Sequence, residues 1–197
     1  MENDKFKDFV ENMKPGISIL GLENRHKNHD KIIRNIFKDI FDDNDKIEYI
    51  NFEENGLSFI EQIVKELFYK TTKYQKNEST YKSIFIIDKI NDNINMIREF
   101  IKDVYTQLNQ YQIYIMLIDD INKIKSKEKE YPLPQLQNTQ SATIPYLANY
   151  IAKIYYIEIG INGEMKDIKA IQYRIDLVKS IDTPIHEPLF YNYKEED

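Results

Sequence analysis

Apolar residues follow two patterns that alternate along the chain between residues 3 and 118. Short runs of consecutive apolar residues are typical of strands buried on both faces of a parallel sheet, and apolar residues at every third or fourth position are typical of amphipathic helices. The runs predict strands at residues 17–20, 47–52, 83–88 and 113–118. The helical spacing predicts helices at residues 3–13, 29–41, 57–70 and 92–109. This alternation predicts an α/β fold with a doubly wound, mostly parallel sheet.

The last third of the chain changes to a one-in-two alternation of apolar residues. This alternation predicts strands at residues 153–159 and 170–178, and Asn162-Gly163 between them is typical of a hairpin turn. A further apolar segment follows at residues 188–193. We therefore expect a C-terminal antiparallel β-hairpin, within a short meander, that extends the sheet at one edge.

Two stretches lack apolar periodicity and are predicted to be loops. The first is the polar run at residues 71–80, and the second is the lysine-rich, then Pro- and Gln-rich segment at residues 122–143. A loop as long as the second is usually functional or disordered when it lies inside a compact domain.

The N-terminal helix is amphipathic but too short to be stable alone, so it must pack on a surface. That surface belongs either to its own domain or to a neighbouring subunit. Pro15-Gly16 ends the element. The chain therefore divides into an arm at residues 1–14, a domain at residues 15–193 and an acidic tail at residues 194–197. The apolar face of the arm consists of Phe6, Phe9, Val10 and Met13.

Composition narrows the class of protein. With 197 residues and a net charge of −6, the chain suits one domain, and its overall charge gives no attraction to nucleic acid or membrane. It has no cysteine, which excludes disulfides and thiolate metal sites. No apolar run approaches the roughly 18 residues of a membrane span, and the N-terminus lacks the apolar core of a signal peptide. We expect an intracellular protein, cytoplasmic or nuclear, without a membrane partner.

Candidate chemistry begins at residues 16–30, where a strand leads through a loop into a helix. The pattern of a phosphate-binding loop is G-x-x-x-x-G-K-[S/T]. Gly21 fits the first glycine, and Lys27 lies where the lysine belongs. His26 replaces the second glycine, at a strain cost of order 1–3 kcal/mol, and Asn28 replaces the magnesium-binding hydroxyl residue. Asp88 ends the buried strand at residues 83–88, which is where P-loop proteins carry a magnesium-directing aspartate.

Histidine could suggest a different chemistry in the same loop. His26 and His29 flank Lys27, but no carboxylate cluster is fixed to them by the sequence. We therefore expect exposed loop histidines and no metal site.

The order of the elements resembles the ATPase core of the RecA superfamily, above all the strand-exchange recombinases and their paralogs. Residues 141–150, followed by residues 154–157, resemble the segment that leads from the DNA-binding loop of that family into a strand. Residues 173–180 resemble its closing hairpin. The resemblance covers residues 14–193 and implies a RecA-like P-loop NTPase core with degenerate Walker motifs. Replicative hexameric helicases share this core and stay an alternative.

The resemblance also implies roles for single residues. Gly21, His26, Lys27, Asn28 and Asp88 would form a vestigial nucleotide site. By position only, Glu53 or Glu54 would match the glutamate that activates water, and Asp120 the glutamine that senses the γ-phosphate. The lysines at the place of the DNA-binding loop are Lys123, Lys125, Lys127 and Lys129.

Several residues depart from the motifs of this family, and each departure weakens catalysis. We therefore expect a degenerate ATPase with no required cofactor, and ATP with magnesium as a doubtful ligand. The first hypothesis is an accessory recombinase paralog that binds another RecA-like subunit and single-stranded DNA. The second is an active ATPase, a recombinase or replicative helicase subunit, with an atypical loop. The third is a RecA-like interaction protein that no longer binds DNA.

Overall fold

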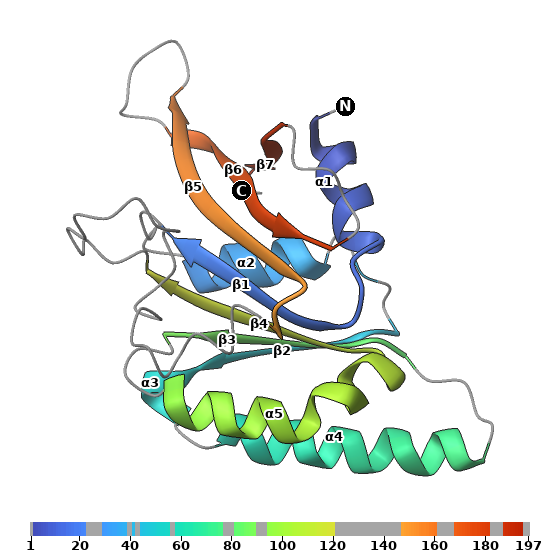
Figure 1. Cartoon of the computed structure of the whole chain (residues 1–197). Helices are drawn as coiled ribbons and strands as arrows, with labels where there is room; N and C mark the ends of the chain where they lie inside the picture. Colours follow the sequence, from blue (N-terminus) through green and yellow to red (C-terminus); the bar gives the residue numbers. More distant parts are fainter. Residues whose placement is uncertain are drawn as a thin grey trace.

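The computed structural model describes residues 2–22, 29–38, 41, 44–55, 58–76, 81–89, 94–120, 147–160, 168–181 and 187–194. They form an α/β fold with one mixed sheet and helices on both of its faces (Figure 1). The strands are β1 (Gly16–Leu22), β2 (Lys46–Asn51), β3 (Ser83–Asp88), β4 (Ile113–Asp120), β5 (Tyr150–Gly160), β6 (Ile168–Ser180) and β7 (Leu189–Lys194). The helices are α1 (Glu2–Glu11), α2 (His29–Lys38), α3 (Phe52–Asn55), α4 (Ser58–Gln75) and α5 (Ile94–Gln110).

The sheet has the order β2-β3-β4-β1-β5-β6-β7. The five strands from β2 to β5 in this order run parallel, because β1 pairs in parallel with both β4 and β5. β6 pairs antiparallel with β5, and β7 antiparallel with β6. The predicted mostly parallel sheet, extended at one edge by antiparallel strands, is thus confirmed.

The two faces of the sheet carry separate apolar cores, because successive side chains of a strand point to opposite faces. α1 and α2 cover one face, where Ile84 and Ile86 of β3 are fully buried. α4 and α5 cover the other face, where Phe85 and Ile87 of the same strand are fully buried. Strands buried on both sides explain the continuous apolar runs of the sequence.

Most elements start or end within a few residues of the prediction, and three differences stand out. α4 continues to Gln75, so the first turn of the polar run at residues 71–80 is helical. The threonine hydroxyls allow this because Thr71 donates to the carbonyl oxygen of Leu67 at 2.7 Å, and Thr72 to that of Phe68 at 2.9 Å. The residues after β2 form the short helix α3 instead of the end of a strand. β5 begins at Tyr150, earlier than predicted.

α1 packs on its own chain. Its Phe6 ring lies edge-on to Tyr191 of β7 at 5.4 Å, and its Phe9 ring edge-on to Tyr150 of β5 at 5.5 Å. Two hydrogen bonds hold the segment after the helix: the Lys14 amide donates to the Tyr150 hydroxyl, and the Tyr114 hydroxyl donates to the Met13 carbonyl. The apolar face of the arm is therefore used within the chain.

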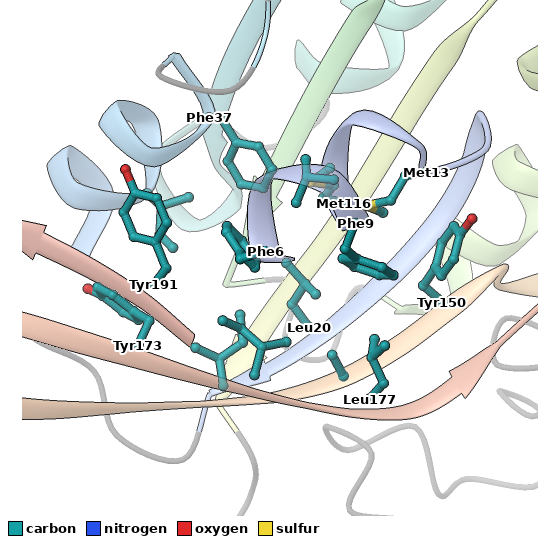
Figure 2. A pocket seen from close by; sticks show the side chains of 15 residues that line it. Phe6, Phe9, Met13, Leu20, Phe37, Met116, Tyr150, Tyr173, Leu177 and Tyr191 are labelled. Atoms are coloured by element: carbon teal, nitrogen blue, oxygen red, sulfur yellow. The ribbon is translucent and has the colours of Figure 1, made fainter. Parts of the chain in front are cut away.

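An apolar cavity of about 40 Å³ lies beneath α1 (Figure 2). Figure 2 shows Phe6 and Phe9 of α1 at this cavity, with Tyr150 of β5, Tyr173 of β6 and Tyr191 of β7 around it. Ala152 of β5 also lines it with a small side chain. The contact between α1 and the sheet is thus incompletely filled.

A buried polar cluster lies where β2, β3 and β4 begin. Glu66 of α4 is 4% exposed, accepts a hydrogen bond from the Ser83 hydroxyl at 2.8 Å and forms a 3.0 Å ion pair with Lys46. Lys70, one turn further along α4, is 0% exposed and donates to the carbonyl oxygens of Tyr81 and Tyr111. This cluster ties α4 to the amino-terminal edge of the sheet.

Candidate functional site

The candidate site lies at the carboxyl-terminal edge of the parallel strands. Register places Gly21 of β1 beside Asp119 of β4, and the last residue of β1, Leu22, beside Asp120. On the other side of β4, Asp88 of β3 lies beside Ile118. The ends of β1, β4 and β3 therefore meet at one edge.

This edge is also where the connections diverge. The chain leaves β1 for α2 on one face of the sheet, and leaves β3 for α5 on the other face (Figure 1). In open α/β sheets, ligands bind outside the carboxyl ends of strands at such a switch in direction. The phosphate-loop pattern and the aspartate-ended strand of the sequence predict candidate residues at this same edge.

Asp88 is the best-defined residue of the site. Its side chain is only 1% exposed, and alternation along β3 places it on the face that α2 covers. The Tyr49 hydroxyl donates a short hydrogen bond to Oδ2 of Asp88, and the Lys89 amide donates to Oδ1 at 2.8 Å. Both carboxylate oxygens are therefore in contact with groups of the protein itself.

The residue after Asp88 has an unusual backbone. Lys89 has a φ of 58°, in the left-handed region that non-glycine residues rarely adopt. Its amide reaches the carbonyl oxygen of Ile118 on β4 at 3.1 Å as well as Asp88. This conformation costs about 1 kcal/mol or more, and the two contacts of the Lys89 amide hold it.

Sequence analysis missed two residues of this site, Tyr49 and Arg34. The Arg34 guanidinium lies 4.8 Å from the centre of the Tyr49 ring, so α2, β2 and β3 meet through Arg34, Tyr49 and Asp88. In the sequence Tyr49 is one of the apolar positions of its predicted strand. Alternation along β2 places it on one face with Asn51, and the pairing of β2 with β3 sets Asn51 beside Asp88.

The carboxylates predicted by position lie at the ends of β2 and β4. Glu53 and Glu54 belong to α3, which follows β2 directly, and Glu54 is exposed. Asp120 ends β4 and is also exposed. The remaining predicted residues lie outside the described residues, namely His26, Lys27, Asn28, Lys123, Lys125, Lys127 and Lys129.

The expectation of an exposed loop position for His29 is wrong. His29 is 2% exposed because it opens the inner face of α2, four residues before the buried Ile33 and eight before the buried Phe37. Among the residues that the structure describes, no three His, Asp or Glu side chains are grouped to hold a metal ion. Over the same residues, no helix is long and apolar enough to cross a membrane.

Comparisons with known proteins give likenesses to solved structures only. No family model matches the sequence, and a search of curated proteins found no match. One similar solved structure is that of a DnaB-like replicative helicase, described with its interactions with primase. The identity is 12% and the TM-score 0.49, over 91% of this chain and 56% of that chain. This likeness is too weak to assign a family or a function.

Proposed function

We propose that this chain is a non-catalytic or weakly catalytic RecA-like protein. It acts as an accessory subunit in DNA recombination or repair by binding another RecA-like protein. The order of the elements supports the ancestry, because Gly21 is the next-to-last residue of the central strand β1 ahead of α2. Asp88 ends β3 at the same edge of the sheet, on the face that α2 covers.

The contacts of Asp88 support the loss of catalysis. A magnesium-directing carboxylate has to offer oxygen to the hydrated cation, and Mg²⁺ demands nearly ideal octahedral geometry. The Asp88 oxygens instead accept hydrogen bonds from Tyr49 and Lys89 in a site that is 1% exposed. A hydrated cation would have to reach these oxygens in a site closed to solvent, and breaking either hydrogen bond there would cost about 1–3 kcal/mol.

Calorimetric titration with Mg-ATP, together with a hydrolysis assay, tests this proposal. We expect at most weak magnesium-dependent affinity and a turnover that Asp88→Asn and Lys27→Ala leave unchanged. Lys38→Ala is the matched control, because Lys38 is an exposed lysine at the far end of α2. Hydrolysis that falls at least about 100-fold in Asp88→Asn and Lys27→Ala, but not in the control, would establish an active ATPase instead.

Binding of single-stranded DNA separates the accessory role from a RecA-like interaction protein that has left DNA. Phosphate contacts make affinity fall with salt, at a slope of about −0.7 per contact on single strands. We expect Lys125→Ala with Lys127→Ala to reduce the slope by about 1.4. Lys102→Ala, on an exposed lysine of α5, should leave it unchanged. Absence of a salt-dependent affinity would contradict the DNA part of the proposal.

A further inference from the structure

α4 has apolar side chains on two opposite sides. On the inner side Phe59, Ile63 and Leu67 belong to the core beneath the sheet. On the outer side Val64 is 48% exposed and Phe68 is 76% exposed. A surface helix normally carries one apolar stripe, and a second stripe indicates that the helix is covered on both sides.

The outer stripe is contiguous. Val64 and Phe68 are four residues apart, so their side chains are neighbours on successive turns of the helix. Thr72 continues the same side one turn later, and its hydroxyl is turned back to the Phe68 carbonyl oxygen at 2.9 Å. Figure 1 shows α4 with α5 in the layer below the sheet, α4 along the lower edge of the view. Val64 and Phe68 are therefore open to solvent.

Charge distinguishes the two ends of this outer surface. Glu61 lies near the start of α4, and its side chain is 73% exposed. Its 3.9 Å contact with Lys65 joins two exposed groups, and such pairs contribute little. Lys76, exposed, follows directly after the last residue of the helix. The outer surface thus carries an acid near its start, Lys65 one turn later and a base at its end.

We propose that the outer face of α4 is a dimerisation surface that packs antiparallel on α4 of a second copy of this chain. When the two α4 helices run antiparallel, Glu61 of each copy lies against the Gln75–Lys76 end of the other. In a parallel pair, groups of like charge would instead face each other. A two-fold axis near Phe68 brings the two Phe68 rings together, and Val64 meets the Thr71–Thr72 turn of the other copy. The same patch serves both subunits, as a two-fold interface requires.

This inference does not depend on the proposed function, because the stripe is on α4 and not at the edge that carries Asp88. A dimer can form whether or not the chain binds nucleotide. The experiments on Mg-ATP and those on self-association can therefore fail separately.

Sedimentation over a range of protein concentrations tests the proposal. We expect a reversible dimer, and Phe68→Glu should raise its dissociation constant at least about 30-fold, as loss of a central aromatic contact does. Ile181→Glu is the matched control, because Ile181 is 49% exposed but follows β6. The proposal would be overturned by a wild-type chain that stays monomeric at millimolar concentration. A dimer whose dissociation constant is unchanged by Phe68→Glu would overturn it as well. Circular dichroism checks that both variants fold.

A charge exchange tests the direction of packing. Glu61→Lys should weaken the dimer because it places two lysines together at each end. Adding Lys76→Glu should restore the dimer, since each end then again pairs opposite charges. Failure of the double variant to recover at least half of the loss would contradict the antiparallel arrangement.

Crosslinking gives a second readout of direction, and the absence of cysteine from the chain makes it clean. Lys65→Cys and Thr72→Cys chains, mixed and oxidised, should form the mixed disulfide in preference to the Thr72→Cys homodimer. In an antiparallel pair centred on Phe68, positions 65 and 72 lie opposite each other. A predominance of the Thr72→Cys homodimer would indicate parallel packing and would overturn the proposal.

Discussion

Lys70 shows at the scale of one residue how burial changes chemistry. Burial lowers the pKa of its ammonium group to about 8, against the opposing charges of Glu66 and Asp45. The group is fully enclosed and donates to the Tyr111 carbonyl oxygen at 3.0 Å. α4 thus contains a lysine that is harder to protonate in the folded chain than in the unfolded one.

The stability of the protein should therefore rise between pH 8 and pH 10. In this range the unfolded chain holds the Lys70 proton more firmly than the folded chain, so deprotonation favours folding, by about 2 kcal/mol over the interval. Above pH 10 a second group opposes this gain in stability. Burial raises the pKa of Tyr81 to about 12, so the unfolded chain loses the Tyr81 proton before the folded chain does, which favours unfolding. Urea unfolding at several pH values measures the rise. Lys70→Met should remove it, and a rise of the same size in that variant would contradict the assignment.

α1 shows at the scale of one element that a helix can depend wholly on its surroundings. Ten residues are too few for a helix to be stable alone in water. Val10, on its inner side, is 2% exposed and lines the cavity beneath the helix. We expect Val10→Ala to release α1 locally before the sheet unfolds. Hydrogen exchange should then show faster exchange of the α1 amides, with β3 and β4 unchanged. Equal acceleration in all three elements would indicate instead that α1 unfolds with the core.

The elements were more predictable than the site. Strands such as Ser83–Asp88 and Ile113–Asp120 were visible as apolar runs because both of their sides are buried. The sequence does not predict the last turn of α4, because Thr71 belongs to a polar run that is typical of a loop. In the structure its hydroxyl donates to the Leu67 carbonyl oxygen within the helix. Tyr49 and Asp88 lie 39 residues apart, and only the pairing of β2 with β3 brings them together. Periodicity within one segment contains no information on such pairing.

At the scale of the molecule, the two faces of the sheet are packed differently. The face under α1 and α2 encloses the cavity, and Ala152 lines it at 3% exposure. On the opposite face, Ala148 is 1% exposed within the core of α4 and α5. Ala152 therefore lines a cavity, whereas Ala148 is buried in the opposite core.

Equal additions of volume should have opposite effects at these two positions. Ala152→Val fills existing space and should raise the free energy of unfolding by about 1 kcal/mol. Ala148→Val forces extra methyl groups into a filled core and should lower it by about 1–3 kcal/mol. Denaturant unfolding of both variants measures the difference. Destabilisation by Ala152→Val to the same extent as by Ala148→Val would mean that the space beneath α1 does not accept a side chain.

The contact of Phe6 with Tyr191 joins the first helix to the last strand. During synthesis, α1 leaves the ribosome long before the surface that holds it exists. At about 5–20 residues per second, the delay is on the order of ten seconds or more. Phe6, Phe9 and Val10 stay uncovered on the nascent chain for that time, as targets for chaperones or for misassociation. Docking of α1 is consequently a late event, and chains interrupted before β7 should present this apolar face to solvent.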